Sequence, residues 1–174
     1  ITITPLKNWN IIGELNIKTD NNWTHYEHKR VYSHMANDPE KTYVATMTGP
    51  SEDKVYEYAY KSLFLNPNVY TNYDITLGQH TIAATAGMQI ERQKYRDVSA
   101  QRADMISTDL PVLNLTTSSQ SYGISGVVQE WASAGFFGRI NYDYAGRYLV
   151  EGNLRYDGSS RFRRGNRWIL TPSF

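Results

Sequence analysis

The feature that most constrains this chain is a strict alternation of side-chain character over residues 140–162, INYDYAGRYLVEGNLRYDGSSRF. Successive side chains of a β-strand point to opposite faces, so residues two apart share a face. The stretch therefore predicts two antiparallel strands around the tight turn Ala145-Gly146-Arg147. One face is polar and charged, and the other is apolar with aromatic ends. The apolar face comprises Ile140, Tyr142, Tyr144, Tyr148, Val150, Gly152, Leu154 and Tyr156.

Similar alternation recurs elsewhere in the chain. It predicts strands over 9–18, 68–77, 81–91 and 136–144, and the start of another over 168–174; residues 23–32 could extend the first of them beyond the membrane. The 14 Tyr, 5 Phe and 4 Trp also favour strands. Residues 97–106 have some helical propensity, but Pro111 soon ends it. We therefore expect an all-β chain of about six or seven antiparallel strands, with at most a turn or two of helix in the loops.

The connections between these strands alternate in length. Short turns are predicted near 5–7, at 78–79 and at 145–147, all at one end of the strands. Long loops are predicted over 19–56, 94–122 and 158–167, at the other end. Outer-membrane barrels combine short periplasmic turns with long extracellular loops, and their tilted strands need about 9–11 residues to cross the bilayer. The apolar faces are about that long, so the pattern favours an antiparallel transmembrane β-barrel.

The strand count is too small for a complete barrel. Bacterial single-chain barrels have an even number of at least about eight strands, and an open sheet edge in lipid leaves backbone groups without partners. The first and last strands are also cut short, at ITIT and TPSF. We expect the chain to be a segment of a larger barrel. A secreted β-sandwich that binds carbohydrate through its tyrosines remains the alternative fold, because it can have the same alternation.

Residues 135–174, GFFGRINYDYAGRYLVEGNLRYDGSSRFRRGNRWILTPSF, closely resemble the barrel signature of the SusC/RagA family, TonB-linked outer-membrane transporters of Bacteroidota. The family pattern is approximately aromatic-FGR-hydrophobic-NY, RY-L, LR-DGSSRF, NRW and PSF, and each element is present. Ile169-Leu170-Thr171 depart mildly from the small or aromatic residues usual after NRW. The resemblance is strong over 131–174, good over 65–115 and loose over 19–60.

The resemblance implies a TonB-dependent barrel of about 22 strands that is closed by an N-terminal plug. It implies import of glycans or peptides, with a SusD-like surface lipoprotein as a lid and the TonB complex pulling on the plug. Residues 1–174 would then be a partial barrel domain, without plug or TonB box, in the outer membrane of a Gram-negative member of the Bacteroidota. A barrel that serves as a component of another envelope complex remains an alternative, because fold does not fix function.

Three groups of residues are candidates for functional contacts. The polar face of the opening hairpin would point into the barrel lumen, where its charges pair with one another or hold the plug: Arg139, Asn141, Asp143, Glu151, Asn153 and Arg155. Extracellular residues could contact a ligand or lipopolysaccharide: Tyr56, Tyr58, Tyr60, Arg161, Arg163, Arg164 and Arg167. Aromatic residues would form girdles at the two membrane interfaces: Trp9, Tyr142, Tyr144 and Tyr148 at the short-turn end, Tyr156 and Trp131 at the other.

Chemistry is not expected from this chain. DGSSRF lacks the GxSxG pattern of a nucleophile elbow and has no matched histidine or acid, so we interpret it as a turn at the outer rim. His25, His28 and His34 invite a metal-site interpretation, but His25 and His28 are three apart, point to opposite faces of a strand and cannot share a metal without a bulge. We therefore expect no enzyme activity, metal or cofactor. With a net charge of +1, we expect no nucleic-acid partner.

Overall fold

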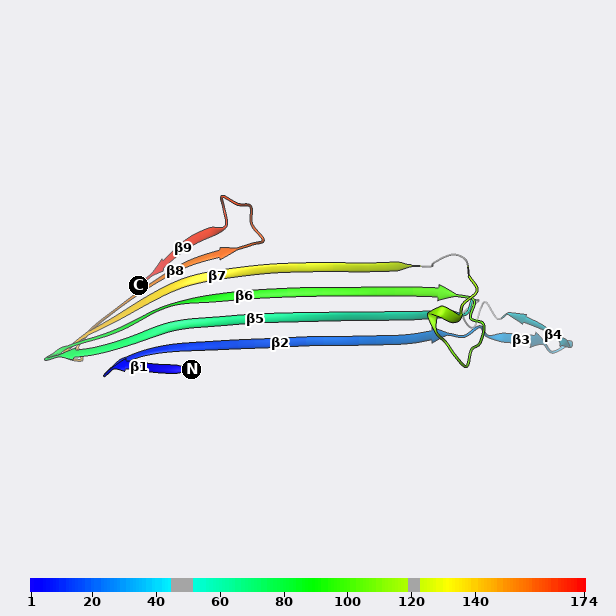
Figure 1. Ribbon diagram of the computed structural model, residues 1–174, viewed down its shortest axis with the longest axis horizontal. Coiled ribbons are helices and arrows are strands. Elements are labelled where there is room, and N and C mark those ends of the chain that lie inside the picture. Colours follow the sequence, from blue (N-terminus) through cyan, green and yellow to red (C-terminus); the bar gives the residue numbers. More distant parts are fainter. Residues whose placement is uncertain (45–51, 119–122) are drawn as a thin grey trace. The chain divides into compact units, whose positions relative to one another are not determined.

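The computed structural model describes residues 1–44, 52–118 and 123–174, and β-strands dominate it (Figure 1). Two short strands, β3 (Tyr32–Met35) and β4 (Asp38–Val44), form a hairpin, and a 3-10 turn spans Leu113–Leu115. In the described residues, no helix is both long and apolar enough to cross a membrane. The other strands are β1 (Thr2–Leu6), β2 (Trp9–His28), β5 (Lys54–Leu77), β6 (His80–Ala103), β7 (Ile124–Tyr144), β8 (Tyr148–Ser159) and β9 (Trp168–Ser173).

These seven strands form one sheet in the order β1-β2-β5-β6-β7-β8-β9, so each pairs with its neighbours along the chain (Figure 1). β7 and β8 pair antiparallel without interruption from Ser133↔Ser159 to Tyr144↔Tyr148. This register sets Tyr142 opposite Val150 and Asn141 opposite Glu151. The predicted hairpin and its two faces are therefore confirmed.

The tight turns use backbone conformations with positive φ. Ala145 and Gly146 have φ of 53° and 67°, and Arg147 N–H donates to the Tyr144 carbonyl at 3.0 Å. Gly78, with φ 63°, lies in the predicted two-residue turn between β5 and β6. Positive φ at a hairpin turn matches the right-handed twist of the paired strands. The first turn was placed slightly early, because β1 continues through Pro5 and Leu6.

The predicted long loops over 19–56 and 94–122 start too early, because β2 continues to His28 and β6 continues to Ala103. Their predicted ends agree within about two residues with the start of β5 at Lys54 and of β7 at Ile124. The segment with helical propensity is thus mostly strand. The apolar stripe was taken as the measure of β6, but the backbone ladder of this strand continues beyond the stripe through mostly polar residues. The loop predicted over 158–167 agrees with the structure, where β8 ends at Ser159 and β9 starts at Trp168.

The chain divides into two compact units. The first unit comprises Ile1–Thr19, Ser62–Lys94 and Gln129–Phe174. The second unit comprises Asp20–Lys61 and Tyr95–Val128. The four longest strands, β2, β5, β6 and β7, contribute residues to both units.

Apolar burial differs between the units. Among the described residues of the first unit no aliphatic or aromatic side chain is buried, and Ile140 and Val150 are 58% and 64% exposed. The second unit buries Val55 and Ala103 almost completely. A β-sandwich would bury the apolar face of one sheet against a second sheet. Among the described residues of the first unit, none forms a layer over its apolar face.

Candidate functional site

An aromatic group lies on the apolar face of the first unit beside the short turns. The rings of Tyr144 and Tyr148, the cross-strand pair next to the turn, stack at 6.4 Å. His80 lies 4.9 Å from the Tyr144 ring, and its Nδ1 is 2.7 Å from the Tyr142 hydroxyl. The hairpin register therefore assembles three of the predicted girdle residues around a histidine that the sequence did not single out.

A second aromatic group lies farther along the same face. Trp168 stacks on Tyr156 at 4.8 Å and on Phe136 at 6.2 Å. Tyr156 was predicted to mark this end, whereas Trp131 was placed here wrongly. Trp131 belongs to the polar face, where its indole N–H donates to Gln93 at 3.1 Å.

Small residues separate the two aromatic groups. Ala84, Gly138 and Gly152 lie in a hollow of about 920 Å³, which Trp9 also lines. The Trp9 indole is fixed by donating its N–H to the Thr71 hydroxyl at 2.6 Å. The hollow is a trough in the apolar face, and its surface is almost entirely apolar. It therefore suits contact with apolar groups.

The polar face of the β7–β8 hairpin carries an ion pair supported by amides. Arg139 Nη2 donates to Glu151 Oε2 at 2.6 Å, and Asn153 Nδ2 donates to Glu151 Oε1 at 2.8 Å. Arg139 Nε also reaches Asn141 Oδ1 at 3.4 Å. The four residues pair with one another, in line with the first of the two roles expected for them. Because both ionic side chains are about half exposed, the pair contributes at most about 1 kcal/mol.

Two members of the predicted polar set make different contacts. Arg155 was expected to share the Arg139–Glu151 pair, but its guanidinium bonds Asp157 at 2.9 and 3.1 Å. Asp143 accepts a hydrogen bond from the Gly146 N–H at 2.7 Å and so caps the turn. Spacing along a strand identified their shared face but did not fix their partners.

Asn66 is the most buried polar side chain of the first unit and was missed by the sequence reasoning. It is 8% exposed, and its Nδ2 donates to the Ile90 carbonyl at 3.0 Å. Its Oδ1 accepts from Asn68 at 3.0 Å and from Asn16 at 3.3 Å. A buried amide whose hydrogen bonds are satisfied holds the neighbouring strands in register. The sequence signal for this site was the pair Asn66 and Asn68, which are two residues apart and so share one face of β5.

In the second unit the predicted tyrosines form a cluster with neighbours from β2 and β6. Tyr56 stacks on Tyr26 at 4.5 Å, and Tyr60 lies 6.0 Å from Tyr58 and 5.7 Å from Tyr95. The hydroxyls of Tyr58 and Tyr95 are 2.8 Å apart. Tyr95 also donates to Asp97 at 3.1 Å. The hydrogen bond with Tyr58, together with desolvation and Asp97, raises the pKa of Tyr95 above its ordinary value.

The histidines do not converge. His25 Nδ1 lies 2.6 Å from Glu57 Oε1, and the Trp23 indole N–H donates to Glu57 Oε2 at 2.6 Å. His28 instead lies beside the Tyr26 ring at 5.4 Å. Desolvation acts to raise the pKa of Glu57, but the bonds from His25 and Trp23 outweigh it and hold the pKa below its ordinary value. Nowhere in 1–44, 52–118 or 123–174 do three potential ligands gather around a possible metal.

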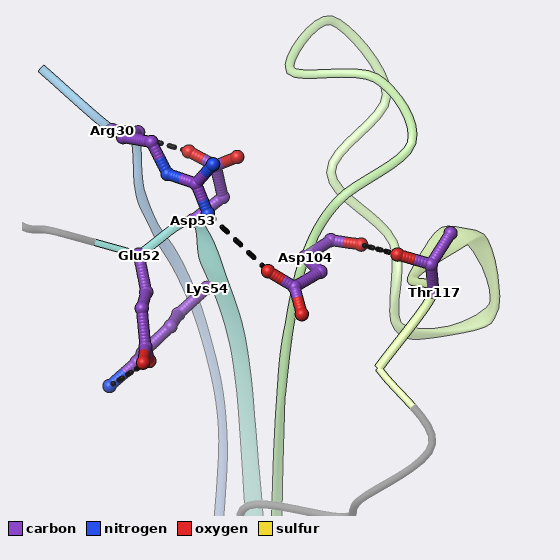
Figure 2. Close-up of polar contacts among 6 residues, drawn as sticks. All are labelled: Arg30, Glu52, Asp53, Lys54, Asp104 and Thr117. Carbon is purple, nitrogen blue, oxygen red and sulfur yellow. Dashed lines mark hydrogen bonds and ion pairs between the residues drawn. The ribbon is translucent and has the colours of Figure 1, made fainter. Parts of the chain in front are cut away.

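A polar clasp connects the ends of three strands in the second unit (Figure 2). The Arg30 N–H donates to Asp53 Oδ1 at 2.6 Å, and Arg30 Nη2 lies 3.4 Å from Asp104 Oδ1. Thr117 donates its N–H and its hydroxyl to the Asp104 carbonyl at 2.7 and 3.1 Å. The clasp ties the loop after β6 to the ends of β2 and β5, next to buried Val55.

The rim arginines of the first unit divide into two pairs. Arg161 lies over the Trp131 ring at 4.7 Å, a cation–π contact. Arg167 Nε donates to the Phe162 carbonyl at 2.9 Å and so holds the loop closed. Arg163 and Arg164 are exposed. Only two of the four predicted contact residues therefore present their charge without a described intramolecular role.

Sequence comparisons give receptors of one kind. No family model matches the chain. The chain is 25% identical to TonB-dependent receptor P3 of Formosa agariphila over 132 residues, 76% of this chain and 13% of that protein. It is 33% identical to TonB-dependent receptor P39 of the same organism over 117 residues, 63% and 11% of the two. Over 38 residues, 22% of this chain and 4% of the relative, it is 53% identical to TonB-dependent receptor SusC of Bacteroides thetaiotaomicron.

Structure comparisons agree on the fold. The chain matches the RagAB peptide importer in its closed-closed state with a TM-score of 0.80 and 22% identity, over 97% of this chain and 18% of that one. The open-open state matches with a TM-score of 0.81 and 21% identity, over 98% and 18%. The chain spans less than a fifth of each of these relatives.

The chain is similar to segments of TonB-dependent receptors, SusC among them, and its antiparallel sheet has the fold of the matching part of RagAB. The resemblance inferred from residues 135–174 is thereby confirmed, as is the predicted fold class.

Proposed function

We propose that the full-length protein imports bulky nutrients, glycans or peptides, across the outer membrane of a Gram-negative member of the Bacteroidota. A SusD-like surface lipoprotein acts as its lid, and the TonB complex supplies energy through a plug outside these residues. The observation that carries the proposal is the 53% identity to SusC within a chain whose fold matches RagAB over 97% of its length. The proposal contains no catalytic step, metal or cofactor.

Within this proposal the two faces of the first unit have different surroundings. The apolar face, with its two aromatic groups, meets outer-membrane lipid, because Trp and Tyr rings prefer the membrane interfaces. The polar face, including Arg139, Glu151 and Asn66, lines a hydrated lumen of a barrel of about 22 strands, where its hydrogen bonds position the wall against the plug.

The tyrosine cluster of the second unit is the candidate ligand contact. Tyr26, Tyr56, Tyr58, Tyr60 and Tyr95 offer rings and hydroxyl groups on neighbouring strands. Aromatic rings stack on sugar rings and on aromatic side chains, so the cluster suits either substrate class. We place the exposed Arg163 and Arg164 at the rim, in reach of an anionic ligand or lipopolysaccharide.

Uptake in the source bacterium tests the proposal. Cells lacking the full-length protein should fail to take up labelled oligosaccharide or labelled peptide, and loss of TonB should give the same defect. The intact protein should co-purify with a surface lipoprotein from detergent-solubilised outer membranes. Unchanged uptake of both substrate classes, together with an altered envelope composition, would favour a structural component of another complex.

A further inference from the structure

The apolar face of the first unit changes character abruptly along β6. Met88 and Ile90 belong to the apolar series, and the next two residues on that face are Arg92 and Lys94. Arg92 and Lys94 are both exposed. Glu91 and Gln93, which alternate with them and lie on the polar face, are partly covered. At about 3.4 Å per residue, Arg92 lies roughly 14 Å along the strand beyond Met88.

The second aromatic group indicates the membrane depth at which the basic residues Arg92 and Lys94 begin. Met88 and Phe136 line the same surface depression, and Phe136 belongs to the stack with Tyr156 and Trp168. Barrel strands tilt by about 35–45°, so Arg92 lies roughly 10 Å above the aromatic level along the membrane normal. Charged lipid headgroups occupy that depth, immediately outside the interface where Trp and Tyr rings lie.

The basic pair, Arg92 and Lys94, has the orientation and the excess positive charge to bind an anion. Glu130 on β7 accepts hydrogen bonds from Arg92 Nε and Nη2, which orients the guanidinium. One edge of that planar group is used, and its other N–H groups point away from Glu130. Lys94 makes no ion pair with any residue in the described part of the chain. The pair exceeds the single carboxylate by one positive charge.

We propose that Arg92 and Lys94 bind the phosphate of a phosphorylated lipid headgroup, whose acyl chains lie on the apolar face beside Met88 and Phe136. Guanidinium and ammonium groups form strong charge-assisted hydrogen bonds with phosphate oxygens. The apolar surface directly below the pair distinguishes a lipid from a free anion. This site depends on the membrane position of the first unit, and it does not depend on import. It differs from the rim arginines, two of which already have partners in the protein.

Native mass spectrometry of the full-length protein, released from detergent micelles, measures such binding directly. The probes are lipid A carrying its phosphates, dephosphorylated lipid A, and inorganic phosphate. The double variant Arg92→Gln/Lys94→Gln should bind phosphorylated lipid A about 25-fold more weakly, about five-fold for each cation. Dephosphorylated lipid A should bind weakly to the wild type, and inorganic phosphate should not compete at equal concentration.

The matched control is Arg139→Gln, which removes one arginine from an exposed ion pair on the opposite face of the same unit and should bind lipid A as the wild type does. A heat-dependent gel shift reports folding, and Lys94→Gln alone serves if the double variant does not fold. Equal binding by the wild type and the double variant, equal binding of the two lipid A forms, or full competition by inorganic phosphate would each overturn the proposal. Substrate uptake is a separate readout, so failure of import would leave this result unaffected.

Discussion

The two units of this chain share four strands but differ in the burial of their apolar side chains. In the first unit none of the described aliphatic or aromatic side chains is buried, and the tight hydrogen bonding lies on the polar face around Asn66 and Glu151. In the second unit Val55 and Ala103 are buried, and Arg30, Asp53 and Asp104 form the polar clasp.

The difference shows which solvent each unit suits. An apolar face without a covering layer is stable only where the surroundings are apolar, and backbone groups in lipid must all be bonded within the sheet. A small core closed by charged hydrogen bonds suits water, where apolar burial drives folding. The four strands that contribute to both units therefore bury their side chains differently in each unit.

The largest expected effect is from a charge on the apolar face of the first unit. Ile140 lies midway between the two aromatic groups, and Ile140→Arg in the full-length protein should destabilise the folded barrel by about 2–4 kcal/mol, the cost of arginine near the bilayer midplane. Asn141→Arg, one residue away on the polar face, is the control and should cost far less. Unfolding by denaturant in lipid vesicles measures both. Equal costs would remove the distinction between the faces.

A smaller effect is expected at the core of the second unit. Val55 is completely buried, so Val55→Ala should lower the free energy of local opening by about 2 kcal/mol, through lost burial and a residual cavity. Val98, 52% exposed in the same unit, provides the control, since Val98→Ala should change it by less than about 0.5 kcal/mol. Hydrogen exchange of the amides of β5 and β6 gives the values. Similar protection in both variants would mean that this unit has no core of its own.

A still smaller change is expected on the polar face of the first unit. Arg139→Gln removes the ion pair with Glu151, but both side chains are about half exposed. The expected loss is at most about 1 kcal/mol, since water and the neighbouring amides replace the pair. The same unfolding experiment in vesicles detects it. A loss as large as that of Ile140→Arg would show that the polar face is not hydrated.

The smallest effect concerns pH in the second unit. The pKa of Glu57 is lowered in the folded protein, so its hydrogen bonds with His25 and Trp23 stabilise the fold above the ordinary glutamate pKa. That contribution is lost as pH falls through the lowered value. The fluorescence of Trp23 is isolated by subtracting the spectrum of the Trp23→Phe variant from that of the wild type. It should change below about pH 4.3. In the Glu57→Gln variant this change in fluorescence should be absent. A change of the same size in that variant would show that another group titrates.

The faces and the turn of the β7–β8 hairpin were predicted from the sequence, because alternation and the turn residues determine them within about twenty residues, but β7 begins earlier than predicted, at Ile124. Strand length was underestimated, because the alternation of apolar and polar residues stops where β2 and β6 pass beyond the apolar face, while the backbone ladder continues to His28 and Ala103.

Side-chain partners were harder to predict than faces. Arg155 bonds Asp157, two residues away, and Trp131 bonds Gln93 from another strand. The Arg155 contact depends on a rotamer that alternation does not specify, and the Trp131 contact depends on the register between strands that are far apart in sequence. Asn66 and the Arg30 clasp were missed for the same reason, since each joins segments more than 20 residues apart.

The central claim is that the apolar face of the first unit meets lipid and the polar face does not. Leu154 and Asn153 are neighbours on opposite faces of β8, and the chain has no cysteine. Spin labels at Leu154→Cys and Asn153→Cys, in the full-length protein in lipid bilayers, can be compared for collisions with oxygen, which concentrates in lipid, and with a water-soluble nickel chelate. The account predicts that oxygen dominates at position 154 and the chelate at position 153. Dominance of the chelate at position 154 would contradict it.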